Sequence, residues 1–146
     1  MKLLRTLKRL KHPRDLWLFL RILKLLILLP GQIRRQSLPD LLARLDPGVG
    51  PGPRDQILLE KTAGFIDSLL NYRLFQRYGR CLLRSLVLFR FLRGQGWPVE
   101  IHFGVRKTSE GLNDITGHSW LVLDGEPFLE DESQRGSFAT TMRYPG

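Results

Sequence analysis

The feature of this sequence that most limits its fold is a change in the spacing of apolar residues near Trp97. Before that residue, apolar side chains recur every three or four positions, which is typical of amphipathic helices. After it, apolar and polar residues alternate over 99–104, which is typical of a strand with one buried face. Helices followed by strands predict an α+β fold with a compact antiparallel sheet. The chain has 146 residues, enough for one such core but too few for a multidomain enzyme.

Proline, glycine and serine residues mark the ends of the expected helices. Pro13 suits the first turn of a helix, which Pro30-Gly31 is expected to end. Ser37 is the expected N-cap of the next helix, and Gly94 follows the most apolar one. The spacing of apolar residues predicts four helices, over 13–30, 38–45, 57–75 and 80–93.

The segment 46–53 is expected to be a loop, because it has three prolines and three glycines in eight residues. It is the candidate boundary between two parts of the chain. The first part, residues 1–50, is a basic helical N-terminal subdomain. The second part, residues 51–146, holds the most apolar helix and the expected sheet.

Two extended runs flank Asp124-Gly125, residues 118–123 before it and 127–131 after it. This dipeptide is strongly favoured in two-residue turns, so the runs predict a β-hairpin. In that register His118 lies opposite Asp131. A bulge at the turn shifts the pairing by one residue and places Glu130 there instead.

The excess of basic residues is confined to the N-terminal end of the chain. Residues 1–36 carry ten Lys or Arg and one acid, a net charge of +9, while the other 110 residues carry thirteen of each sign. The net charge therefore describes one segment rather than a binding face of the whole domain. A nucleic-acid partner is not expected.

The same end holds the most apolar run of the chain, Leu16–Leu29. Its fourteen residues are interrupted by Arg21 and Lys24, whereas a membrane-spanning helix needs about 20 mostly apolar residues. No small-residue cleavage site follows the run, so secretion is not expected. Two interpretations stay open. The run is either a buried helix that covers the core, or a basic amphipathic helix that docks a partner or lies on the inner face of an anionic membrane.

Cys81 is the only cysteine, which excludes an internal disulfide framework and a cysteine-based structural zinc site. A reducing, cytoplasmic location fits best, and neither a metal nor a cofactor is expected. At the start of its predicted helix, this cysteine lies near unpaired backbone amides, which favour thiolate over thiol. Arg80 and Arg84 are expected to reinforce that effect. The alternative is a small buried apolar residue with no chemical role.

Catalysis by a thiolate also needs a base whose ring is held by a third polar group. Of the three histidines, His118 begins the first run of the expected hairpin, and Glu130 and Asp131 lie on the returning run. His12 and His102 have no comparable setting. The cysteine, the hairpin histidine and one of the two acids are therefore the candidate catalytic group.

Several motifs occur together over residues 57–135: Arg80-Cys81-Leu82-Leu83-Arg84-Ser85-Leu86-Val87-Leu88, Leu92-Arg93 with Gly96, Ile101-His102-Phe103-Gly104-Val105-Arg106, and Gly117-His118-Ser119-Trp120-Leu121 with Asp124-Gly125. This combination resembles the transglutaminase-like cysteine proteases of lasso-peptide maturation. The resemblance implies a papain-like core, in which a cysteine-bearing helix packs on a small antiparallel sheet.

The resemblance also implies roles for individual residues. Cys81 would be the nucleophile, and His118 the general base and then the general acid. Asp131, or alternatively Glu130, would orient the imidazole, and Trp120 would pack beside the site and contact substrate. The usual His-Ala-Trp motif of the family has serine in its middle position here, which leaves it recognisable.

Partners follow from the same resemblance. Enzymes of this family remove the leader from a ribosomally made precursor peptide, and a cyclase that resembles asparagine synthetase then closes an isopeptide ring. The first 56 residues of this chain do not resemble the winged-helix-like leader-recognition domain that is fused in some members. A separate leader-recognition protein is therefore expected, and the chain alone should be nearly inactive.

Two other classes of function stay open at the level of sequence. The chain could be a non-catalytic binding module in which the cysteine and histidine pack the core. It could also be a thiol acyltransferase, because the same nucleophile serves acyl transfer as well as hydrolysis. Labelling of the cysteine by a thiol-reactive probe at neutral pH distinguishes a catalytic thiol from a core one.

Overall fold

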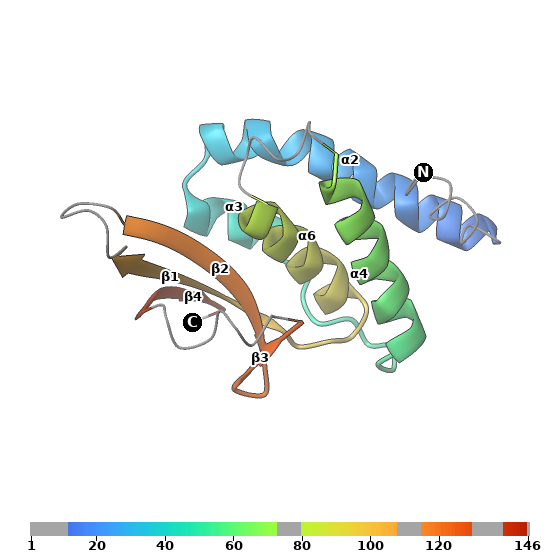
Figure 1. Ribbon diagram of the computed structural model, residues 1–146. Coiled ribbons are helices and arrows are strands. Elements are labelled where there is room, and N and C mark those ends of the chain that lie inside the picture. Colours follow the sequence, from blue (N-terminus) through green and yellow to red (C-terminus); the bar gives the residue numbers. More distant parts are fainter. Residues whose placement is uncertain (1–11, 73–79, 108–114, 130–138, 146) are drawn as a thin grey trace.

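The computed structural model describes residues 12–72, 80–107, 115–129 and 139–145. Within these residues, helices are followed by a four-stranded antiparallel sheet, which confirms the predicted α+β fold (Figure 1). The helices are α2 (Pro13–Arg35), α3 (Leu38–Leu45), α4 (Gln56–Leu70) and α6 (Arg80–Gly94). The strands are β1 (Glu100–Lys107), β2 (Ile115–Leu123), β3 (Glu126–Phe128) and β4 (Ala139–Tyr144).

Helix α2 does not end at Pro30-Gly31, as the sequence predicted, but continues through them to Arg35. An interior proline costs about 3 kcal/mol, because it removes one hydrogen bond and crowds the preceding turn. Leu29 is fully buried just before the proline, and Ile33 packs against the core one turn after it. Fully burying a side chain such as Leu29 contributes about 1.5–3 kcal/mol, and together with the partial burial of Ile33 this is enough to offset the proline.

The extension makes α2 long enough and apolar enough to cross a membrane by length and composition alone. It has 23 residues, and its most apolar 18-residue window has a mean hydropathy of 1.8. The sequence predicted that the apolar helix would end at Pro30, which made it too short to cross a membrane. A core helix of a soluble protein and a secretory signal pass the same test, and 28% of the window is buried in this fold.

The next two helices begin with side-chain caps. Ser37 Oγ accepts a hydrogen bond from Asp40 N at 3.4 Å, as predicted for the N-cap of α3. Asp55 Oδ1 accepts from the backbone amides of Ile57 and Leu58, which caps α4. Helix α4 ends at Leu70, earlier than the sequence predicted. Residues 73–75 of the predicted helix lie outside the described residues.

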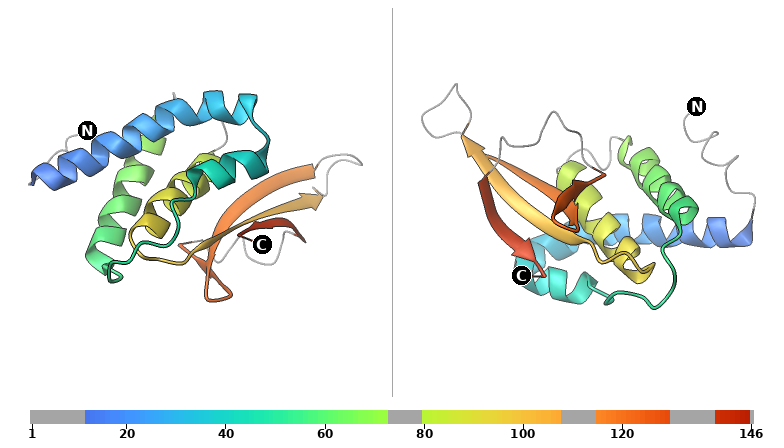
Figure 2. Two further views of the ribbon diagram at one scale, coloured as in Figure 1. Left: turned by 180° about the vertical axis from the view of Figure 1, so that it is seen from behind. Right: turned by 90° about the horizontal axis from the view of Figure 1, so that it is seen from below.

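Helix α6 is the centre of the core. Its fully buried side chains include Leu83, Leu86, Val87, Leu88, Phe89 and Leu92. It lies between the sheet on one side and α2 and α4 on the other (Figures 1 and 2). Side chains of α2 and α3 join the same buried cluster as those of α4, α6 and β1. The segments on either side of the candidate boundary at residue 50 thus share one core.

Arg93 fixes the far end of α6. Its guanidinium is almost buried, pairs with Asp46 at 2.8 Å and donates to the Val99 carbonyl at 3.0 Å. The Arg93 carbonyl in turn accepts from Gly50 N at 2.8 Å. A Cβ on Gly50 would lie 2.2 Å from the Gly94 carbonyl oxygen, so the loop needs glycine at this close approach. The 46–53 loop, α6 and the start of β1 are therefore held as one unit.

The sheet has the strand order β3-β2-β1-β4. The predicted hairpin is confirmed: Asp124 and Gly125 form a two-residue turn with φ of 53° and 83°, and Leu121 pairs with Phe128. Strand β2 begins at Ile115, three residues before the predicted start. The sequence also did not predict β4, which pairs with β1 on the side opposite β2.

Candidate active site

Cys81 is the second residue of α6 and is partly buried. Two serines hold this first turn of the helix against β2. Ser119 Oγ donates to the Cys81 carbonyl oxygen at 3.0 Å, and Ser85 Oγ donates to the Ser119 carbonyl oxygen at 3.1 Å. The two hydroxyl oxygens lie 3.2 Å apart, and both serines are almost fully buried. We call these contacts the serine clamp.

His118 is the chain neighbour of the clamped Ser119, so its Cα lies one peptide, about 3.8 Å, from that of the serine. Side chains alternate along a strand. The serine faces α6, and the imidazole leaves the strand on the other side. The residue paired with His118 on β1 is Gly104, which has no side chain to occupy the space beside the ring. The structure therefore brings the backbones of Cys81 and His118 close together, with the imidazole on the face of β2 that is turned away from α6.

An irregularity in the sheet lies at the same level. The pairing of β1 with β4 shifts between Phe103 and Gly104, the two residues that pair with Ser119 and His118 on β2. Such bulges bend a strand and increase its twist, and they re-aim neighbouring side chains. The sheet is thus locally distorted beside the candidate base.

Trp120 lies against the His118 ring, with the ring centroids 5.7 Å apart and the planes 17° from parallel. His102, which pairs with Trp120 from β1, has its ring centroid 6.0 Å from that of the tryptophan. His102 Nε2 is 3.2 Å from Glu100 Oε2 on the same strand. A row of three rings therefore crosses β2 and β1. The histidine nearer to the clamp is His118.

The two arginines near the cysteine have partners that limit their effect on a thiolate. Arg84 Nε pairs with Asp67 Oδ1 at 2.8 Å, so its charge is balanced by a carboxylate of α4. Arg80 Nη1 donates to the neutral amide oxygen of Asn71 at 3.0 Å. Both arginines tie α6 to α4 and its end. Both arginines were expected to favour the thiolate. In these contacts Arg84 is paired with a carboxylate, whereas Arg80 is paired with a neutral amide.

The chain leaves the hairpin towards the first turn of α6. Arg84 Nη1, one helical turn after the cysteine, donates to the Leu129 carbonyl oxygen at 3.0 Å. Leu129 has a φ of 56° and ends the β2–β3 pairing at Phe128. The register that was expected to choose between Glu130 and Asp131 therefore stops before them. Both acids lie outside the described residues.

The sequence model of the transglutaminase-like superfamily matches residues 22–143, which is most of the chain. The chain belongs to the transglutaminase-like superfamily. This superfamily includes cysteine proteases and acyltransferases. The match covers both the cysteine helix and the histidine strand, and it runs across residue 50 without a break. Comparisons with curated proteins and with solved structures give no match.

The transglutaminase-like fold of this chain contains site features that the sequence did not point to. The serine clamp joins α6 to β2 through two small residues, and Gly104 is the residue of β1 that pairs with His118. The only signal in the sequence was the small residue between histidine and tryptophan. Among the described residues, no three His, Cys, Asp or Glu side chains gather in a way that could hold a metal ion.

Proposed function

We propose that this transglutaminase-like protein is a cysteine peptidase in which Cys81 is the nucleophile and His118 the base. The observation that carries the proposal is the hydrogen bond from Ser119 Oγ to the Cys81 carbonyl oxygen. It fixes the first turn of a helix next to the strand residue that follows the histidine. A cysteine at a helix start and a histidine on an adjacent strand are the two parts that thiol catalysis needs.

The proposed reaction has two steps. The Cys81 thiolate attacks the scissile carbonyl, the peptide C–N bond breaks, and the imidazolium of His118 gives its proton to the leaving amine. The product of this step is a thioester on the cysteine. His118 then takes a proton from water, which attacks the thioester, releases the new carboxylate and restores the thiol. An acid orients the imidazole through both steps.

We further propose that the substrate is the leader segment of a lasso-peptide precursor. The support is the resemblance of the cysteine helix, the Gly117-His118-Ser119-Trp120 strand and the Asp124-Gly125 turn to that family of proteases. The partners are then a separate leader-recognition protein and a cyclase similar to asparagine synthetase. The site of action is the cytoplasm, where a lone thiol stays reduced.

The proposed function predicts cleavage by the unmodified chain in the presence of its recognition protein. Mass spectrometry of a precursor peptide should show free leader and free core, and a thiol-reactive probe at neutral pH should label Cys81. In heavy-oxygen water, the label should enter the new leader carboxylate, because water resolves the thioester. Transfer of the leader onto an added amine would instead identify an acyltransferase. No labelling and no cleavage would leave a non-catalytic binding module.

The third catalytic residue is proposed to be Asp131, with Glu130 as the alternative. The support comes from the sequence: a hairpin with a two-residue turn at Asp124-Gly125 and no bulge would pair Asp131 with His118. Asp131→Asn should lower the single-turnover cleavage rate by about 10²–10⁴-fold, because an amide cannot orient and stabilise the imidazolium as a carboxylate does. The matched variant Glu130→Gln should change it little. A severe loss in Glu130→Gln with a mild one in Asp131→Asn would exchange the two roles.

A further inference from the structure

Helix α2 is apolar on two opposite faces. Its inward face supplies the buried residues Leu18, Phe19, Ile22, Leu26 and Leu29. Its outward face carries Leu16, Trp17, Leu20, Ile27 and Leu28, each between 46% and 67% exposed. Single exposed apolar residues are ordinary, but a row of them along one helix marks a surface that binds something. A helix that is apolar all round is typical of helices covered on both sides.

The charges of α2 are sorted in the same way. Its one acid, Asp15, is 7% exposed and lies 3.4 Å from Lys61 Nζ of α4. The cations Arg14, Arg21 and Lys24 are exposed. The outward face therefore combines large apolar side chains with positive charge, while the negative charge is turned inward and paired.

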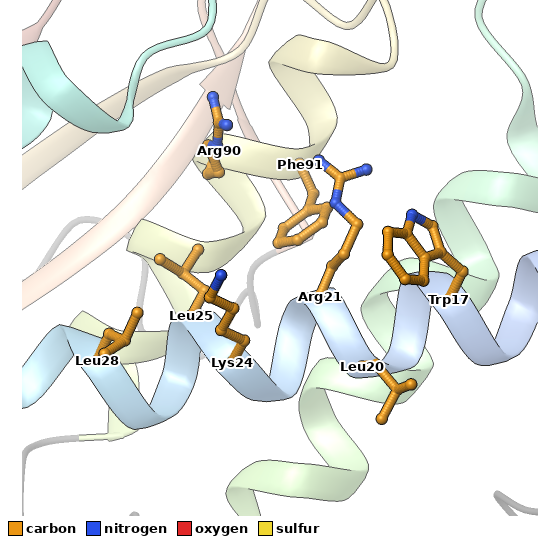
Figure 3. A pocket seen from close by; sticks show the side chains of 8 residues that line it. All are labelled: Trp17, Leu20, Arg21, Lys24, Leu25, Leu28, Arg90 and Phe91. Carbon is orange, nitrogen blue, oxygen red and sulfur yellow. The ribbon is translucent and has the colours of Figure 1, made fainter.

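A groove of about 370 Å³ runs between α2 and α6 on this side of the molecule (Figure 3). Trp17 and Leu28 of α2 line it together with Arg21, Lys24 and, from α6, Arg90. The Arg21 guanidinium lies 5.4 Å from the centroid of the Phe91 ring, which holds this cation at the groove. The groove thus offers apolar walls with cations at their edges. A phospholipid matches this arrangement, because its acyl chain is apolar and its phosphate group is negatively charged.

We propose that the outward face of α2 binds the surface of an anionic bilayer, a function separate from peptide cleavage. The helix lies in the plane of the membrane, with Trp17, Leu20 and Ile27 at the level of the acyl chains and the cations at the headgroup phosphates. It does not span the bilayer, because its inward face forms the core of the domain. We call Leu16, Trp17, Leu20, Ile27 and Leu28 the membrane face.

Charge and shape favour a lipid surface over an acidic protein. The apolar side chains lie along about three and a half turns of one helix and form a ridge, and a fluid lipid surface can adapt to that shape. Residues 1–36 carry ten basic groups and one acid, and a bilayer attracts every exposed cation of such a segment, whatever its position. A protein partner would need acids placed to match each one.

The experiment is co-sedimentation of the full chain with vesicles of phosphatidylcholine and phosphatidylglycerol in equal parts, and with neutral phosphatidylcholine vesicles. We expect binding to the anionic vesicles, reduced when ionic strength rises from about 0.1 to 1 M and the screening length falls from about 10 to 3 Å. Trp17→Ser should lower the partition coefficient at least about tenfold, because it removes a large apolar side chain that the bilayer would otherwise bury. Lys24→Glu should also weaken binding.

Matched variants distinguish binding through the membrane face from non-specific adsorption of any exposed apolar side chain. Ile27→Ser, on α2, should weaken binding, whereas Ile57→Ser, on α4, should not, although both side chains are well exposed at 58% and 67%. Arg143→Glu, on the exposed side of β4, is the control for Lys24→Glu. Failure of the folded wild-type chain to bind anionic vesicles overturns the proposal, and so does equal loss in both isoleucine variants. Because vesicle binding is measured without peptide, neither result depends on the proposed peptidase activity.

Discussion

Replacing Cys81 with alanine is expected to abolish peptide cleavage and leave the fold in place. A methyl group cannot attack a carbonyl, so no thioester forms and the residual rate should fall by at least about 10³-fold. The side chain is only partly buried, and the loss of one sulfur atom should cost only about 1–2 kcal/mol of stability. Leader removal is measured by mass spectrometry with the recognition protein present.

Two controls distinguish loss of the nucleophile from loss of the folded structure. Thermal unfolding followed by circular dichroism should show a single transition close to that of the wild type. Cys81→Ser keeps the size and polarity of the side chain but gives a much weaker nucleophile, and it should be as inactive as the alanine variant. Cleavage at the wild-type rate by Cys81→Ala would contradict the peptidase proposal outright.

The second large effect is expected for His118→Gln, with His102→Gln as its matched control. Both histidines lie against Trp120, at 5.7 Å and 6.0 Å between ring centroids, and both are partly buried. Only His118 is next to the serine clamp. Glutamine keeps hydrogen-bonding capacity but cannot accept and return a proton, so the His118 variant should lose about 10³-fold or more in turnover.

The His102→Gln control shows whether a loss of activity is specific to His118. His102 interacts with Glu100 on its own strand, and His102→Gln should keep most of the activity. A loss of activity in His102→Gln that equals the loss in His118→Gln would show that the ring row supports the sheet rather than the chemistry. It would remove the reason for naming His118 as the base.

Local signals in the sequence predicted the elements that carry the site. The Asp124-Gly125 turn, Gly94 at the end of α6 and Gly96 just after it are residues whose backbone preferences act on their immediate neighbours. Helix α2 was predicted too short, because the cost of Pro30 is local whereas the burial that offsets it comes from other helices. Strand β4 was missed for a similar reason. It is short, and one of its stabilising contacts joins Tyr144 to Phe89, far apart in the chain.

The candidate site was predictable only in part. The cysteine and the histidine stand out by residue type and by their places in predicted elements. The serine clamp could not be predicted, because it depends on the distance between a helix and a strand 34 or more residues apart. The third residue depends on the chain after Leu129. A left-handed conformation at a leucine is not encoded in any turn pattern.

The serine clamp has a consequence for how the proposed activity depends on folding. The proposed nucleophile and the proposed base belong to different structural layers, and at the first turn of α6 the clamp hydrogen bonds join the two layers. In a chain whose sheet has not docked on α6, the backbones of the proposed nucleophile and base are not held near one another. Local opening between the layers would disconnect the pair while the helices stay folded. On the proposed mechanism, an unfinished or partly opened molecule is therefore unable to cleave peptides, and cleavage would report that assembly is complete.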